Sequence, residues 1–284
     1  MNKHLLRTLC YTLIILFGLT ACNTDDMQRS PNGKLILQHE VSPSGALSYT
    51  LHHYGDKGLE RVLDIPTIGI DTESGSGEGL IFKEVKGPRH HVDDYAMLSG
   101  KRSQCHNEAN EYIYRMEDYK GNEVRIVMRI YNDGLAFRYE SDALAGESIT
   151  GEETLFQFAP DTKRWTQPYA VGYEDFYFSN TDGKTNSKSR RWNMPALFQP
   201  APSSYVLLAE ANVLRDQCGA YLSNRDDASS YRVQLFDKHF VCPEEWRSPW
   251  RLAIVGSLAD VVESTLVTDV SDPCRLDDTS WIKP

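Results

Sequence analysis

The sequence lacks an excess of basic residues. Its 284 residues include 30 Lys and Arg against 40 Asp and Glu, which gives a formal net charge of -10 at pH 7. Because phosphate binding needs a basic face, this balance argues against a nucleic-acid partner. A neutral partner such as a glycan fits the charge at least as well.

A long apolar run is also lacking. The run from Leu13 to Leu19 is shorter than the roughly 20 residues that a transmembrane helix needs. Lys3 and Arg7 precede it, and Leu19-Thr20-Ala21-Cys22 follows it in the manner of a lipoprotein signal-peptidase site. We therefore predict a signal peptide over residues 1–21 and lipidation of Cys22. An ordinary secretory signal that contains a cysteine is the alternative.

The residues after Cys22 bear on the location of the protein. Asn23 differs from the aspartate that retains lipoproteins at the inner membrane, and Asp25-Asp26 weakly resembles the surface-export signals of some gut bacteria. We expect a protein of the cell envelope, anchored through lipid to the outer membrane and facing the periplasm or the cell surface.

Cysteine is scarce and widely spaced. Cys105, Cys218, Cys242 and Cys274 contain no C-x-x-C pair, which argues against a zinc or redox site. In an oxidising compartment these four cysteines allow one or two disulfides, among three full connectivities. Buried free thiols are the alternative.

Helical periodicity is scarce, and the patterns present are those of strands and turns. Val124, Ile126, Met128 and Ile130 alternate with other residues, and Asn132-Asp133-Gly134 supplies a turn before residues 135–140, which predicts a hairpin. Residues 258–266 show a helical pattern with Ser257 as N-cap. We predict an all-β sandwich with minor helix. Further strands are expected at residues 35–39, 49–54, 111–117, 155–158, 205–211, 231–236 and 252–255.

Three motifs resemble the N-terminal domain of glycoside hydrolase family 97, the calcium-dependent α-glucosidases and α-galactosidases. They are residues 131–140 (YNDGLAFRYE), 248–251 (SPWR) and 277–284 (DDTSWIKP). The resemblance implies a large β-super-sandwich similar to galactose mutarotase. It also implies that residues 280–284 lead into a catalytic (β/α)8 barrel, which this sequence does not contain.

The predicted domain organisation follows from these features. We expect a signal peptide at 1–21, a tether at 22–30, the β-sandwich at 31–276 and the start of a linker to the barrel at 277–284.

Glu210 is the candidate metal-binding residue. It interrupts the apolar segment of residues 205–211, where an unpaired carboxylate is costly and is expected to find a cation or strong donors. By the family resemblance, a glutamate in this Glu-Ala motif reaches into the barrel mouth and coordinates the catalytic calcium, which prefers oxygen ligands. The alternative is a glutamate paired with an arginine such as Arg215 or Arg251.

Other polar and aromatic residues indicate less specific roles. Glu152-Glu153 and Asp93-Asp94 are adjacent in sequence, so their side chains point to opposite faces of a strand and are interpreted as solvated. His52-His53 and His90-His91 raise the alternative of mutarotase chemistry, but no motif fixes a histidine opposite a glutamate. Trp250 and Trp281 are expected to pack, Trp281 against the barrel, where without a barrel it would be exposed.

Three classes of function remain. The first is an N-terminal domain that completes the substrate pocket and calcium site of an exo-acting α-glycosidase, with no catalytic residue of its own. Its partners would be α-linked glucosides or galactosides and a barrel in the same or another chain. The second class is a stand-alone carbohydrate-binding lipoprotein, and the third is an inactive remnant of an interrupted gene.

Overall fold

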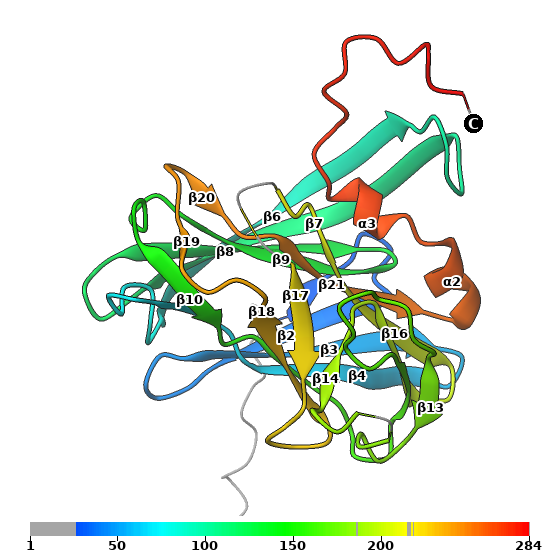
Figure 1. Cartoon of the computed structure of the whole chain (residues 1–284), viewed down its shortest axis with the longest axis horizontal. Coiled ribbons are helices and arrows are strands. Elements are labelled where there is room, and N and C mark those ends of the chain that lie inside the picture. Colours follow the sequence, from blue (N-terminus) through cyan, green and yellow to red (C-terminus); the bar gives the residue numbers. More distant parts are fainter. Residues whose placement is uncertain (1–26, 186, 215–216, 218, 284) are drawn as a thin grey trace, which may run out of the picture.

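The computed structural model describes residues 27–185, 187–214, 217, 219–283. Two large antiparallel sheets pack face to face, as Figure 1 shows, which confirms the predicted all-β sandwich. The eight strands of the first sheet are, in spatial order, β1 (Met27–Arg29), β2 (Leu35–Val41), β3 (Leu47–Gly55), β4 (Gly58–Thr67), β11 (Leu155–Gln157), β18 (Ser230–Leu235), β17 (Ala220–Ser223) and β14 (Arg191–Trp192).

The second sheet has ten strands and provides the other layer. Its spatial order is β13 (Phe178–Asn180), β12 (Lys163–Thr166), β15 (Ala196–Ala201), β16 (Ser204–Ala211), β21 (Trp250–Gly256), β9 (Gly134–Ser141), β8 (Glu123–Tyr131), β7 (Gln104–Glu117) and β6 (Ile81–Ala96), with β20 (Trp246–Arg247) paired to β9. A small third sheet contains β19 (Phe240–Val241), β10 (Ser148–Glu152) and β5 (Ile70–Thr72).

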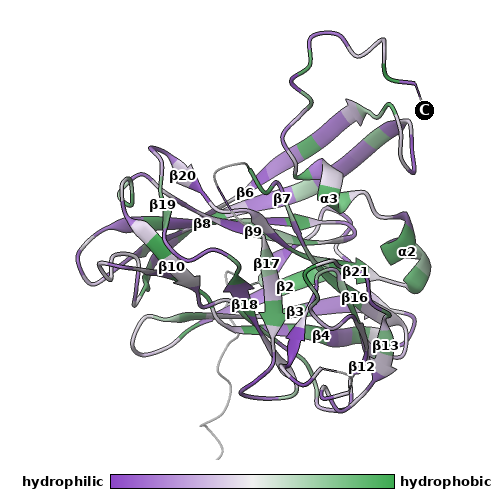
Figure 2. Ribbon diagram, in the orientation of Figure 1, coloured by the Kyte–Doolittle hydropathy of each residue, from purple (hydrophilic) through white to green (hydrophobic). Residues whose placement is uncertain are grey.

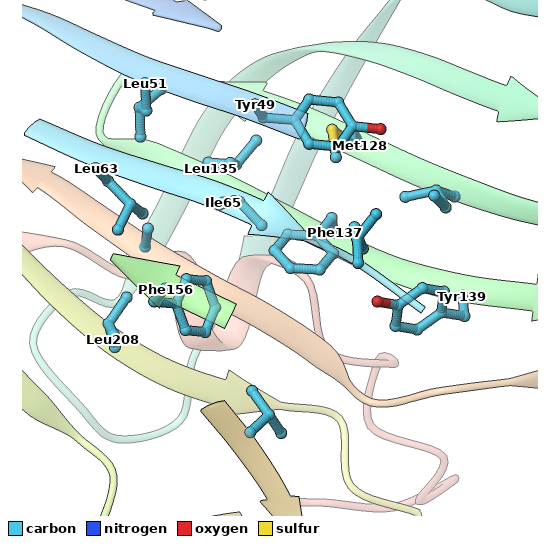
Figure 3. Packing of buried hydrophobic residues seen from close by; sticks show 14 of the residues in the cluster. Tyr49, Leu51, Leu63, Ile65, Met128, Leu135, Phe137, Tyr139, Phe156 and Leu208 are labelled. Carbon is cyan, nitrogen blue, oxygen red and sulfur yellow. The ribbon is translucent and has the colours of Figure 1, made fainter. Parts of the chain in front are cut away.

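The main core fills the space between the two large sheets. Alternate residues of β3 and β4, such as Leu51 and Leu63, face Leu135, Phe137 and Leu208 of the second sheet (Figure 3). The period of two in the sequence produces this arrangement, because successive side chains of a strand point to opposite faces.

The second sheet also buries part of its outer face. Two short helices, α2 (Leu258–Glu263) and α3 (Leu266–Asp269), lie on that side, and Val261 and Leu266 join a second apolar cluster with Leu252 and Ile254. All of β21 is therefore buried, which explains why its sequence is apolar on both faces.

The predicted hairpin is confirmed, since β8 and β9 pair from Arg125–Glu140 to Tyr131–Gly134. The predicted strands all occur, with ends that differ by a few residues. The helix is shorter than expected, because α2 ends at Glu263 and α3 begins separately at Leu266. Ser257 is its N-cap, as predicted.

Two features differ from the sequence expectation. The sheet already begins at Met27, inside the segment predicted as a tether, because β1 pairs with β2. The long strand β6 was not predicted, since its residues are mostly exposed and polar. Figure 2 shows that the β6–β7 hairpin is largely hydrophilic where it projects from the sandwich. None of the described helices is long and apolar enough to cross a membrane.

Candidate functional site

Glu210 lies near the end of β16, on the face that lines the sandwich interior. Val206 and Leu208, which share this face, belong to the main core, whereas Ala209 and Ala211 belong to the outer cluster. The Glu210 side chain retains 17% of its exposure, so it is neither fully buried nor free in solvent. One of its carboxylate oxygens accepts a hydrogen bond from the Ala220 backbone N–H at 2.9 Å.

Arg251 joins Glu210 to a second carboxylate. The two residues are register partners on β16 and β21, and Arg251 Nη1 lies 2.8 Å from Glu210 Oε2. The same guanidinium donates from Nη2 to Glu152 Oε2 at 2.6 Å and from Nε to both Glu152 oxygens at 3.1 Å. The pairing of Glu210 with an arginine, which was the alternative, is therefore present. Arg215 lies outside the described residues.

The interpretation of Glu152 as a solvated residue is wrong. Its side chain is only 3% exposed, while Glu153 is exposed, so the two do point to opposite faces as expected. Glu152 ends β10, which lies over this end of the sandwich and turns the carboxylate towards Arg251. Sequence reasoning missed the partnership because 99 residues separate the two.

The cluster of Glu210, Arg251 and Glu152 carries one positive and two negative charges. Burial would lower the pKa of Arg251, but the two carboxylates raise it, so the guanidinium stays protonated. Burial raises the pKa of the Glu210 carboxyl and the nearby Glu152 charge adds to this rise, while Arg251 and the Ala220 N–H offset it only in part. Glu210 is thus a carboxylate whose charge is incompletely compensated.

A small cavity of about 30 Å³ adjoins the cluster. Glu152, Arg251, Trp246, Ile149 and Ile70 are among its lining residues. A cavity of this size has room for a water-sized group and not for a sugar ring.

Glu210 fits the expected role as a single calcium ligand. It offers carboxylate oxygens, and calcium takes about six to eight oxygen ligands. Among the residues that the structure describes, no group of three or more His, Cys, Asp or Glu side chains could hold a metal.

The other candidates are placed as follows. Asp93 pairs with His91 at 2.9 Å and accepts from the Tyr131 hydroxyl at 2.8 Å, whereas Asp94 is exposed and pairs with His106. Neither aspartate faces the other, as expected for neighbours on a strand.

The two tryptophans behave as expected. Trp250 is buried in the outer cluster, where the Arg138 and Arg129 guanidinium carbons lie 4.3 and 4.9 Å from its ring centroid. Trp281 is 68% exposed, and its indole N–H donates to the Asp278 carbonyl.

The cysteines show no pairing among those that the structure describes. Cys105 and Cys242 are buried free thiols, and Cys274 is exposed and free. Cys22, the predicted lipidation site, and Cys218 lie outside the described residues.

Three comparisons with known proteins place this β-sandwich in a family of glycoside hydrolase domains. The profile described as Glycosyl-hydrolase 97 N-terminal matches residues 29–273. The chain belongs to this family. It is 27% identical over 254 residues to a "Probable retaining alpha-galactosidase" of Streptomyces bingchenggensis (strain BCW-1). The aligned region covers 89% of this chain and 38% of that protein.

Solved structures share the same fold. A glycoside hydrolase family 97 enzyme from Pseudoalteromonas sp. strain K8, in complex with acarbose, superposes with a TM-score of 0.79 at 19% identity, over 91% of this chain and 40% of that one. A beta-arabinopyranosidase superposes with a TM-score of 0.77 at 24% identity, over 88% and 43%. This chain thus spans about two fifths of the length of these relatives.

Proposed function

We propose that this chain is the N-terminal domain of an exo-acting α-glycosidase that removes terminal α-linked glucose or galactose. In this proposal, a (β/α)8 barrel, in the same or another chain, carries the catalytic carboxylates. The sandwich shapes the substrate pocket and supplies Glu210 to a calcium site. Bound calcium would polarise and position groups near the scissile bond.

The observation that carries this proposal is the charge of the cluster around Glu210. Two carboxylates share Arg251, and Glu210, the less buried of the two, keeps part of its surface open at the end of β16. A cation that approaches from outside this chain would compensate the remaining negative charge. Membership of the glycosyl-hydrolase 97 N-terminal family supports the same role.

Calorimetric calcium titration tests the proposal. The sandwich is combined with a family 97 barrel, and the wild type is compared with Glu210→Gln and with Glu40→Gln, an exposed glutamate of β2 in the other large sheet. We expect Glu210→Gln to weaken calcium binding by at least tenfold, because a charged ligand is lost, and Glu40→Gln to bind as the wild type does. Equal affinities in all three proteins would reject the assignment.

We also propose that the mature protein is anchored through lipid on Cys22 at the outer membrane. Support comes from the Leu19-Thr20-Ala21-Cys22 sequence and from the start of β1 only five residues after Cys22. Cells fed a labelled fatty acid should label the wild type and not Cys22→Ser. Label that persists in the variant would refute the anchor.

A further inference from the structure

A polar cavity lies at the end of the sandwich opposite to Glu210. β21 runs from Trp250, beside Glu210, to Gly256, which is one of the cavity residues. The five residue steps from Arg251 to Gly256 span roughly 16 Å at about 3.3 Å per step. The cavity measures about 290 Å³, close to the lower end of the range of about 300–1,000 Å³ that is usual for ligand pockets.

Five separate parts of the chain build this cavity. They are the turn between β1 and β2, the end of β3, the turn from β6 into the start of β7, the turn between β8 and β9, and the segment from β21 through α2 to Thr265. Asn32, Lys34, His53, Asn132 and Asp260 are among its lining residues. Because the turns are tied together by a hydrogen bond of 2.9 Å from the Asn32 backbone N–H to Asn132 Oδ1, the wall is held in place by the fold.

His53 presents a fixed hydrogen-bond acceptor to the cavity. It is only 8% exposed, and its Nδ1 lies 2.7 Å from the Ser204 hydroxyl oxygen. Ser204 donates its single proton to the Glu60 carboxylate at 2.5 Å, so His53 Nδ1 must carry the hydrogen that it shares with Ser204. The tautomer is thereby set, and Nε2 holds a lone pair. Within the described residues, Nε2 has no hydrogen-bond partner.

Hydrogen-bond donors surround this acceptor. The Asn32 and Asn132 side-chain NH2 groups and Lys34 Nζ make no hydrogen bond to any described residue, although each residue lines the cavity. The cavity therefore offers unused donors and an unused acceptor together. A ligand with hydroxyl groups matches this combination of donors and an acceptor, because a hydroxyl group can both donate and accept a hydrogen bond.

The charges of the lining favour a neutral ligand. Arg102 is paired with Glu263 at 3.6 Å, and Asp260 accepts from the Ser257 backbone N–H at 2.8 Å. The oxygens of Asp133 accept from Asn107 and Ser264. The two cations of the lining, Lys34 and Arg102, are outnumbered by its three carboxylates, Asp133, Asp260 and Glu263, so the cavity lacks the surplus positive charge that a phosphate needs.

We propose that this cavity binds one neutral sugar residue of a glycan, with His53 Nε2 accepting a hydrogen bond from a sugar hydroxyl. This inference goes beyond the proposed function, because it concerns a separate binding site at the other end of β21 and needs neither calcium nor a barrel. It gives the sandwich a glycan contact of its own.

Titration of the 15N-labelled chain with D-galactose and D-glucose, followed by two-dimensional NMR, tests the proposal. The key variant is His53→Asn, because the asparagine amide can replace the Nδ1 donor to Ser204 while nothing replaces Nε2. His52→Asn is the matched control, since it makes the same substitution on the neighbouring residue, which does not line the cavity. If His53→Asn does not fold, Lys34→Met replaces it as the test variant, because Lys34 lines the cavity at an exposed position.

We expect saturable shifts of cavity amides such as Gly256 with at least one of the two sugars. His53→Asn, or Lys34→Met in its place, should weaken binding about fivefold, which is the effect of one neutral hydrogen bond, and His52→Asn should not. The proposal is overturned if no sugar produces saturable shifts there, or if both histidine variants bind equally. Saturable shifts with inorganic phosphate in place of sugar would also overturn it.

Discussion

At the scale of single residues, Arg251 has the most consequential position. It is 1% exposed and, among the residues that the structure describes, is the one cation paired with the Glu152 and Glu210 carboxylates. A buried ion pair contributes little net stability when intact, but removal of one partner leaves an uncompensated buried charge. Arg251 therefore fixes both the orientation of Glu210 and the stability of this end of the sandwich.

Replacement of Arg251 should be strongly destabilising. We expect Arg251→Met to lower the free energy of unfolding by about 3–5 kcal/mol, as measured by urea denaturation, because two carboxylates lose their counter-charge. Arg61→Met is the control, since the Arg61 side chain is 64% exposed in its pair with Asp64 and should cost less than about 1 kcal/mol. Similar losses in the two variants would contradict this account.

His53 should make stability depend on pH. Its pKa is lowered below the ordinary value of 6.5, mainly by burial. Charged groups around it act in both directions: Glu60, Asp260 and Asp56 raise the pKa, and Lys34 lowers it. Because the unfolded chain then binds a proton more readily than the folded chain, His53 favours unfolding as the pH falls below about 6.5.

The variant His53→Asn isolates this effect. Urea denaturation between pH 5 and pH 8 should show a smaller loss of stability on acidification in the variant than in the wild type, since the titrating group is gone. Above pH 7, where the histidine is neutral in both states, the two curves should run parallel. An identical pH dependence over the whole range would show that His53 contributes nothing to it.

At the scale of secondary structure, an element could be predicted where its sequence has a regular apolar alternation and recognisable turn residues at its end. β8 and β9 have an apolar face each and are joined by a turn with Asn132-Asp133-Gly134, so the hairpin followed from the sequence. β6 has few buried residues and is held by its backbone pairing with β7. Backbone hydrogen bonds leave no periodic mark in a sequence, which is why β6 escaped prediction.

The N-cap of α2 offers a test at this scale. The Ser257 hydroxyl accepts from the Asp260 backbone N–H at 3.2 Å, and the Asp260 side chain accepts from the Ser257 backbone N–H at 2.8 Å. We expect Ser257→Ala to lower the free energy of unfolding by about 1 kcal/mol in urea denaturation. Ser271→Ala, at a partly exposed site after α3, should change it by less than about 0.5 kcal/mol. Equal effects would argue against the cap.

At the scale of the whole molecule, the main core and the outer cluster hold the second large sheet from both sides. The described residues after Val270 contribute to neither, and Figure 1 shows this segment extending away from the sheets. Its hydrogen bonds near the end are local, such as those from Ser280 and Trp281 to Asp278. The boundary predicted between sandwich and linker can therefore be tested by truncation.

Removal of residues 277–284 should leave the sandwich intact. We expect the free energy of unfolding to change by less than about 0.5 kcal/mol, because the described residues of this segment are largely exposed. Thermal and urea unfolding of the two chains provide the measurement. As a contrast, a chain that begins at Ser30 should be less stable than one that begins at Met27, since it loses β1. A large loss from the C-terminal truncation would place the segment within the domain.

The sequence by itself determined the fold class and the family, and it singled out Glu210 as a polar residue in an apolar strand. These conclusions rest on local signals, namely the period of two, turn residues and short motifs. Only the tertiary structure decided that Arg251 and Glu152 hold Glu210, and that Ser204 and Glu60 set the tautomer of His53. The partners in each case lie far apart in the chain, and contacts of that kind depend on how sheets stack, which no local pattern records.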